Sequence, residues 1–584
     1  MKTTFVTLAA LICEASAAFI PSKSHRHLHS RRDVVPRQSC ENTATSRSCW
    51  GDYSIDTDYY TVIPDNGITR EYWLSVENTT SIAPDGYARS AMTFNGTVPG
   101  PAIVADWGDN LVIHVTNNMA HNGTAIHWHG IRQLGSLEYD GVPGVTQCPI
   151  APGESLTYKF QATQYGSSWY HSHFTLQYGD GLLGPLIING PATADYDEDL
   201  GAVFLQDWGH RSVFQLWDTA KLGGPPELEN GLINGNNTFD CSTSTDENCV
   251  GGGIKTTFNF EAGKKYRMRL INAAVDGHFQ FSIDGHSLTV IANDLVPIVP
   301  YAADSIEISI GQRYDVIVEA NATPGDYWLR AGWTNACSSN GNAEDITAII
   351  RYDASSTADP TSTSTIEVSD SCGDEPLASL VPHLALNVDD IGETTTQSLS
   401  FVFTDYFHWT INTSSLVLDW ANPTTLMIFN NETIWPTEYN VLPIEKKGTS
   451  SDEFAVYVIS DNTGFGISHP IHLHGHDFWV IGQDTGSFDA TSSTLNLVNP
   501  PRRDVATLPG NGYLAIAFKK DNPGSWIMHC HIAWHASEGL AMQFVESESE
   551  ISVAMNDADT FMDTCAAWND YAAVEVYLQD DSGI

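Results

Sequence analysis

Short segments of alternating apolar and polar residues recur along most of the chain. Examples are residues 111–117 (LVIHVTN), 156–162 (LTYKFQA) and 455–460 (AVYVIS), with turns rich in glycine and proline between such segments. Side chains on an extended strand point alternately to its two faces, so a period of two residues predicts strands. We therefore predict an all-β protein built of β-sandwiches.

These segments fall into three blocks, which we assign to three domains. The first domain is expected at residues 39–193, the second with a following linker at 194–365, and the third with a C-terminal tail at 366–584. Residues 354–365 (ASSTADPTSTST) have the low-complexity composition of a linker. A chain of 584 residues is too long for one hydrophobic core, which agrees with several domains.

The amino terminus has the pattern of a secretory signal at residues 1–18, with an apolar run and the small residues ASA at 15–17. A basic stretch at 19–38 contains the dibasic pair Arg31-Arg32, and we assign it and its three histidines to a propeptide. No other stretch is long and apolar enough to span a bilayer. We expect a secreted, extracellular glycoprotein. Its N-x-S/T sequons lie at Asn78, Asn95, Asn122, Asn236, Asn321, Asn412 and Asn431.

The formal charge is strongly negative, at -44, because 71 acidic residues face 27 basic ones. Such a surface argues against nucleic acid or an anionic membrane as a partner. Of the ten cysteines, Cys13 lies in the signal and Cys530 is a candidate ligand, which leaves eight for disulfides in an oxidising compartment. Local closeness favours the pairs Cys40–Cys49 and Cys241–Cys249.

Four His-x-His pairs carry the chemistry of the chain. Alternate side chains on a strand face the same way, so each pair directs two imidazoles to one point. One such pair alone is weak evidence, but four pairs among 21 histidines are improbable as surface residues. The pairs are His127/His129, His171/His173, His472/His474 and His529/His531.

The sequence predicts copper at two kinds of site. A thiolate with two imidazoles is the ligand set of a mononuclear blue-copper centre, and His469, Cys530 and His535 supply it. The eight paired imidazoles can hold three further metals. Because Cys530 lies between His529 and His531, the chain itself links the two sites.

With these residues the chain resembles the multicopper oxidases, and within them the laccases of filamentous ascomycete fungi, over nearly the whole mature length. The resemblance implies four copper ions: one type 1, one type 2 and two type 3. His469, Cys530 and His535 match the type 1 ligands, and His127 with His472 the type 2 ligands. The matching type 3 ligands are His129, His171, His173, His474, His529 and His531. The motifs concerned are HWHGIRQ, WYHSHFTLQYGDGLLGPLII, HPIHLHGHDF and HCHIAWHASEGL.

The resemblance also has structural implications. It implies three cupredoxin-like Greek-key domains, with the trinuclear cluster between the first and the third, and the disulfides Cys148–Cys565 and Cys337–Cys372. It leaves Cys241–Cys249 as a departure from the family, and it gives His476 no metal. The ending Asp581-Ser582-Gly583-Ile584 looks like the tail that enters the solvent channel of the cluster in the ascomycete group.

Further residues are assigned roles by the same resemblance. Leu540 stands at the axial position of the type 1 site, where it cannot coordinate, and Asp140 matches an acid that delivers protons to reduced oxygen. Glu229 matches the acid that binds a phenolic hydroxyl and acts as general base while His535 takes the electron. The apolar wall of this pocket is expected from Phe407, Trp409 and Trp534, although core packing explains the first two about as well.

The predicted function is that of a secreted, monomeric laccase that oxidises small phenolic or aromatic amine donors in one-electron steps and reduces dioxygen to two waters. Two other multicopper oxidases, a ferroxidase and a bilirubin-type oxidase, share every ligand and stay open as alternatives. A copper-binding cupredoxin without turnover is the alternative of a different class, and it would lack the eight paired imidazoles.

Overall fold

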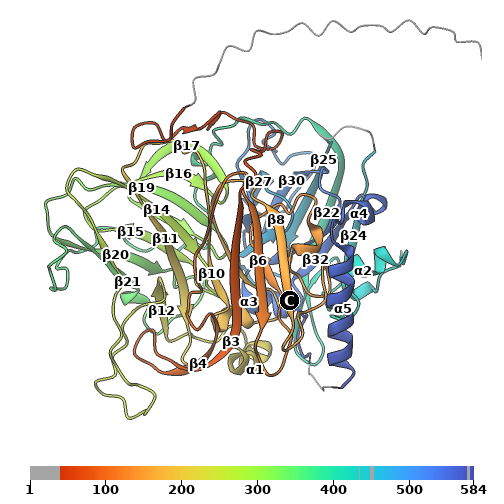
Figure 1. Cartoon of the computed structure of the whole chain (residues 1–584), viewed down its shortest axis with the longest axis horizontal. Coiled ribbons are helices and arrows are strands. Elements are labelled where there is room, and N and C mark those ends of the chain that lie inside the picture. The colour runs from red at the N-terminus through yellow and green to blue at the C-terminus, as the bar shows by residue number, and fades with distance from the viewer. Residues whose placement is uncertain (1–39, 433, 448–452, 575–578) are drawn as a thin grey trace, which may run out of the picture. The chain divides into compact units, whose positions relative to one another are not determined.

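The computed structural model describes residues 40–432, 434–447, 453–574 and 579–584, so the predicted signal, propeptide and Cys13 lie outside the described residues. Within this part, strands dominate and helices are few and short (Figure 1), which confirms the all-β prediction. The sheets form three groups in chain order. No helix of the described part is long and apolar enough to cross a membrane.

The first group has two four-stranded sheets, of order β4-β3-β6-β8 and β5-β10-β9-β7. Side chains of both sheets meet in one core, for example Ile113 of β6 and Ile188 of β10. The strands are β3 (Thr69–Ile82), β4 (Arg89–Phe94), β5 (Ile103–Asp106), β6 (Asn110–Asn117), β7 (Ile126–Trp128), β8 (Ser155–Gln161), β9 (Gly166–Ser172) and β10 (Leu183–Asn189), preceded by the small hairpin β1 (Cys49–Trp50) and β2 (Tyr53–Ser54).

The second group has a six-stranded sheet, β12-β11-β14-β19-β16-β17, and a five-stranded sheet, β13-β21-β20-β15-β18. Residues 352–376, which include the predicted linker, form no helix or strand. The strands are β11 (Glu198–Trp208), β12 (Asn230–Ile233), β13 (Thr257–Asn259), β14 (Lys265–Asn272), β15 (Phe279–Ile283), β16 (Leu288–Asn293), β17 (Val296–Ala303), β18 (Ser305–Ile308), β19 (Arg313–Glu319), β20 (Asp326–Trp333) and β21 (Thr347–Arg351).

The third group repeats this plan with sheets β23-β22-β25-β30-β27-β28 and β24-β32-β31-β26-β29. Its strands are β22 (Asp390–Phe403), β23 (Phe407–Ile411), β24 (Val441–Ile444), β25 (Glu453–Asp461), β26 (His469–Leu473), β27 (Phe478–Thr485), β28 (Arg502–Arg503), β29 (Val505–Leu508), β30 (Gly512–Lys519), β31 (Gly524–Cys530) and β32 (Ala541–Glu546). The helices of the chain are α1 (Val213–Gly223), α2 (Thr424–Phe429), α3 (Ala533–Ser537), α4 (Glu548–Ala554) and α5 (Ala558–Ala572), with 3-10 turns η1 (Leu137–Tyr139), η2 (Gln177–Asp180), η3 (Ala343–Asp345), η4 (Leu377–Ser379) and η5 (Thr437–Tyr439).

The predicted alternation holds in some strands and fails in others for a structural reason. In β6 every second residue is buried, as the segment 111–117 predicts. In β25, by contrast, all nine residues are buried. Tyr457 and Ile459 join one core cluster, whereas Val456 and Val458 join another, so this central strand packs on both faces.

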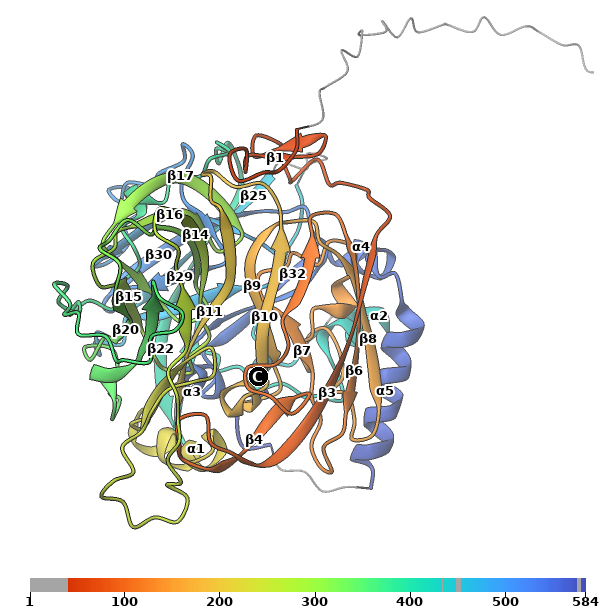
Figure 2. The same cartoon turned by 60° about the vertical axis from the view of Figure 1, so that its left-hand side comes forward.

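Contacts from the C-terminal region join the third group to the first. Helix α5, which lies near β6 and β8 in Figure 2, begins after Asp557, and this residue pairs with Lys159 of β8. The disulfide Cys148–Cys565 lies in the same apolar cluster as Trp568. All four expected disulfides are present: Cys40–Cys49, Cys148–Cys565, Cys241–Cys249 and Cys337–Cys372.

Candidate metal centre

The register of two antiparallel strand pairs brings the four His-x-His motifs together. In the first group His127 of β7 lies opposite His171 of β9, and in the third His472 of β26 lies opposite His529 of β31. Directly opposed residues of an antiparallel pair face the same side. Each strand pair therefore presents four imidazoles from two separate sequence motifs.

The two sets of imidazoles interleave in the interior. The His127 and His474 ring centroids lie 3.8 Å apart, those of His129 and His472 lie 3.9 Å apart, and all four rings are buried. The Nε2 atoms of His173 and His529 are 3.4 Å apart. Sets of three ligand atoms within 4.8 Å of one another are His127/His129/His171, His127/His472/His474 and His173/His474/His529.

The hydrogen bonds of these rings leave the inward nitrogens open for a metal. Nδ1 of His127 donates to the carbonyl oxygen of Asp140 at 2.8 Å, and Nδ1 of His472 to that of Asp504 at 2.7 Å. A carbonyl oxygen only accepts, so Nδ1 carries the proton and Nε2 keeps a lone pair. Both Nε2 atoms are buried and make no hydrogen bond to a described residue. This is the tautomer that metal-binding histidines require.

Burial keeps the imidazoles in the neutral form that binds metal. It lowers the pKa of His529 to about 4 and the pKa of His171 well below the ordinary value, because water no longer solvates the charged ring. Neighbouring histidines lower the pKa of His171 further. A cluster of neutral, buried imidazoles with unpaired inward nitrogens fits several copper ions.

The second site lies on the other side of strand β31. Sγ of Cys530 is 3.7 Å from Nδ1 of His469 and 3.5 Å from Nδ1 of His535, and these two nitrogens are 3.1 Å apart. Burial raises the pKa of the Cys530 thiol, so the thiolate needs a cation beside it. Leu540 is buried, and its carbonyl oxygen accepts from the Cys530 amide, so the two residues are backbone neighbours in the same apolar core.

Asp140 and His476 have different surroundings. Asp140 Oδ2 accepts from Nδ1 of His474 at 2.9 Å, while its carbonyl oxygen accepts from His127, so one acidic residue orients two candidate ligands. His476 points away from the cluster: its Nε2 lies 3.0 Å from Oε2 of buried Glu546. It belongs to none of the ligand groups among the described residues.

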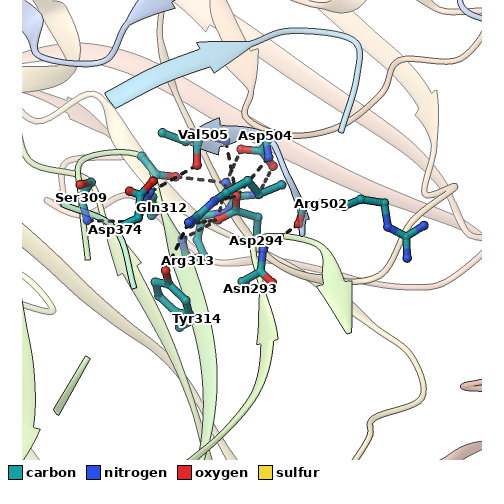
Figure 3. A network of polar contacts seen from close by, with 12 residues as sticks. Asn293, Asp294, Ser309, Gln312, Arg313, Tyr314, Asp374, Arg502, Asp504 and Val505 are labelled. Atoms are coloured by element: carbon teal, nitrogen blue, oxygen red, sulfur yellow. Dashed lines mark hydrogen bonds and ion pairs between the residues drawn. The ribbon is translucent and has the colours of Figure 1, made fainter. Parts of the chain in front are cut away.

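A buried ion-pair network joins the cluster to the middle group of sheets, which supplies no ligand. Arg313, the first residue of β19, forms a bidentate pair with Asp504 at 2.5 and 2.6 Å (Figure 3). Asp504 Oδ1 in turn lies 3.1 Å from Nε2 of His129. Asp294 accepts from the Asp504 amide at 3.1 Å and completes the network. The Arg313–Asp504 pair thus orients His129 and leaves its Nδ1 open.

Sequence reasoning missed this network. Asp504 follows the pair Arg502-Arg503, and an acid beside two arginines is a weak signal because most such groups are solvated. The partner of Asp504 lies 191 residues away in another group of sheets. No local pattern marks that contact.

His535 also lies at the junction of two open cavities. One, of about 240 Å³, is partly polar and includes Asp276, His278 and Ser309. The other, of about 270 Å³, is mostly apolar and includes the predicted Phe407, Trp409 and Trp534. We call them the polar lobe and the apolar lobe; both are also lined by Pro225, Phe465 and Ile467.

Glu229 lines neither lobe. Its Oε2 accepts from the backbone amide of His210 at 2.8 Å, so the predicted place of Glu229 at the donor pocket stays a prediction. The acid that does line the polar lobe is Asp276, whose backbone follows β14. Burial, with the charge of Asp207, raises the pKa of Asp276 to about 8. Glu229 lies in a loop that gives no periodic signal, so the sequence alone does not decide where its carboxylate points.

The end of the chain closes a small cavity at the cluster. Ile584 lines it together with His171, His173 and His529, and the cavity holds only about 20 Å³. The tail is held by hydrogen bonds, from Ser582 Oγ to the Ala536 carbonyl and from Trp420 Nε1 to the Gly583 carbonyl. The tail therefore lies at the cluster, as expected from the sequence.

Comparisons with known proteins agree with this geometry. Three models of the family described as multicopper oxidase match residues 76–193, 200–355 and 406–550. Laccase-2 of Botryotinia fuckeliana is 67% identical over 100% of both chains. A crystal structure of the laccase from Botrytis aclada is 69% identical and superposes with a TM-score of 0.91, covering 94% of this chain and 100% of that one.

A more distant solved structure has the same fold. It is that of Fet3p, described as a multicopper oxidase that functions in iron import, and it is 26% identical with a TM-score of 0.76. The match covers 86% of this chain and 95% of that one. Likeness of fold at this level is compatible with more than one electron donor.

Proposed function

Because this chain belongs to the multicopper oxidase family and is a laccase of the fungal type, we propose that it takes single electrons from phenols and aromatic amines at His535 and reduces dioxygen at the eight-histidine cluster. Four copper ions are the cofactors of this family. The observation that carries the proposal is the pair of sites on β31, with Cys530 facing one and His529 and His531 facing the other.

The ligand sets are those that the resemblance to the family implies, and the converging groups of ligand atoms support them. His469, Cys530 and His535 would hold the type 1 copper, and His127 with His472 the type 2 copper. The type 3 pair would be held by His129, His171, His173, His474, His529 and His531. When bound, copper supplies a one-electron acceptor at Cys530 and the four-electron reduction of dioxygen to two waters at the cluster. Leu540 has no donor atom in its side chain, so it would add no ligand to this site.

The donor's proton and electron leave in different directions. Asp276 in the polar lobe takes the proton of a phenolic hydroxyl, and the electron enters at the His535 imidazole. From Cys530 the backbone continues directly to His529 and His531, so the covalent path to the cluster is short. At the cluster Asp140 passes protons to reduced oxygen, and its Oδ1, which makes no hydrogen bond within the described part of the chain, is the atom open for this role.

The donor pocket favours an aromatic donor over the alternatives. Aromatic rings of Phe407, Trp409, Phe465 and Trp534 line the apolar lobe, and they suit a flat ring better than hydrated Fe(II), which prefers carboxylate and water ligands. Convergence of all eight paired imidazoles disfavours a cupredoxin without turnover, since the His531 ring also lies beside His129 and His472.

The location, assembly and domain boundaries are proposals of the same kind. The signal-like sequence and four disulfides support secretion after removal of residues 1–18 and 19–38. We take the protein as a monomer with domains at 39–193, 194–365 and 366–584, without nucleic acid or membrane as partner. The three groups of sheets support these domains.

The test is metal analysis combined with oxygen uptake on a panel of phenols, with Fe(II) and bilirubin as competing donors. We expect four coppers per molecule, and a Cys530→Ser variant that loses the blue colour and turnover but keeps copper at the cluster. One copper per molecule, turnover by the Cys530→Ser variant, or oxidation of Fe(II) far faster than every phenol would refute the proposal.

A further inference from the structure

The apolar lobe contains an acid that the proposed function does not use. Glu538 follows helix α3 and is 5% exposed, and it lines the lobe together with Phe403, Phe407 and His535. Its Oε2 accepts a hydrogen bond from Nε1 of Trp409 at 2.9 Å. Its Oε1 makes no hydrogen bond to any residue within the described ranges.

Packing does not account for this carboxyl. The bond from Trp409 requires one acceptor, which a glutamine would also provide. Burial among aromatic rings raises the pKa of Glu538 to about 8. Its unpaired Oε1 is not among the fully buried atoms of the described residues, so this oxygen is open to the lobe. Polar groups that break the pattern of an apolar pocket are typical of binding sites.

The position of Glu538 relative to Asp276 indicates what it binds. The two acids line different lobes, and both lobes open on His535. An aromatic ring that contacts His535 with one hydroxyl at Asp276 therefore has a second acid beside the part of the ring that enters the apolar lobe. A hydroxyl group can pair with a carboxyl in either protonation state, and an amino group can donate to it.

We propose that Glu538 binds, through Oε1, a second hydroxyl or amino group of the aromatic donor. This rests on the proposed function. The site then selects diphenols, aminophenols and aromatic diamines over donors with a single polar group. Glu538 acts in binding and recognition; the proton and electron of the reacting group still leave through Asp276 and His535.

The test compares three donors in three variants, with the wild type as reference for each donor. The donors are hydroquinone, 1,4-phenylenediamine and 2,6-dimethylphenol, which has one polar group. Glu538→Leu should lower kcat/KM for the first two donors about tenfold more than for 2,6-dimethylphenol. Such a factor corresponds to the loss of one hydrogen bond. Because each donor is compared with itself, differences in donor potential cancel.

Glu538→Gln separates recognition from a structural role. Its amide oxygen keeps the Trp409 bond, so its NH2 group faces the lobe and can donate to a hydroxyl but not accept from an amine. We expect hydroquinone to be oxidised within about twofold of the wild type and the diamine to lose about tenfold. Ser415→Ala is the matched control, because the Ser415 hydroxyl donates to the Glu538 carbonyl and does not line the lobe.

The outcomes distinguish this inference from the proposed function. Equal losses for all three donors in Glu538→Leu, or an unchanged rate with the diamine in Glu538→Gln, would show that Glu538 only positions Trp409, and the inference would be wrong. If the wild type itself oxidised none of the donors, the proposed function would fall and the inference with it. Blue absorption equal to that of the wild type confirms that each variant keeps the type 1 copper.

Discussion

Replacing Arg313 by methionine tests whether the middle domain, which supplies no ligand, maintains the copper cluster. Arg313 and Asp504 are 0% and 1% exposed at their side chains, and two short bonds join them. Removing one partner of such a pair leaves an uncompensated buried charge and costs about 3–5 kcal/mol. The Asp504 carboxyl then takes up a proton or shifts, and His129 loses the contact that orients it.

The effect on metal follows from that loss. Partners that orient a metal-binding histidine typically contribute a factor of about 10–100 in metal affinity. We expect the Arg313→Met variant to lose copper from the cluster first, while the blue absorption of the Cys530 site stays, because Arg313 does not contact Cys530, His469 or His535. Copper per protein, the type 2 electron paramagnetic resonance signal and calorimetric unfolding measure these effects.

Arg351→Met is the matched control. Arg351 pairs with Asp326 at 2.9 Å between β21 and β20 of the same middle group of sheets, with both side chains largely buried and no ligand nearby. It should lower the free energy of unfolding and leave four coppers in place. If Arg313→Met kept all four coppers and an unaltered type 2 signal, or if Arg351→Met lost as much copper, the orienting role of Arg313 would be disproved.

Three further predictions concern the donor site, the type 1 site and the tail. Asp276→Asn should lower the rate of phenol oxidation about 100-fold but spare a non-phenolic dye, whereas Glu229→Gln should change neither rate. Because the pKa of Asp276 is raised to about 8, the fraction of its proton-accepting carboxylate grows as pH rises, and Asp276→Asn should therefore flatten the pH profile for phenols. Equal losses for phenol and dye would exclude a base. Leu540→Met should lower the reduction potential of the type 1 site, because an added thioether ligand stabilises Cu(II) relative to Cu(I). An unchanged potential in a redox titration would show that residue 540 does not face the copper. Burial raises the pKa of Asp581 to about 7. Docking of the tail is therefore strongest below the pKa that Asp581 has in the unfolded chain, near 4, and weakens as pH rises through 7. Protease cleavage of the tail should increase over that range, and cleavage of the Asp581→Asn variant should not depend on pH.

The candidate ligands could be identified from the sequence because their geometry is local. On a strand the spacing of two residues alone makes His529 and His531 face one way and Cys530 the other. The strand type itself was predictable from the same period, as in β6. The local disulfide Cys241–Cys249 was also predictable, since its cysteines are only eight positions apart.

Residues whose role depends on contacts between distant segments could not be identified in this way. Glu229 lies in a loop, and its carboxylate accepts a hydrogen bond from the His210 amide, while Asp276 reaches the polar lobe through the path of the chain after β14. The Arg313–Asp504 pair and the second acid Glu538 belong to this class as well. Spacing along one strand decides which side chains share a face, but only the packing of whole sheets decides which faces meet, because that packing sums many weak contacts between residues hundreds of positions apart.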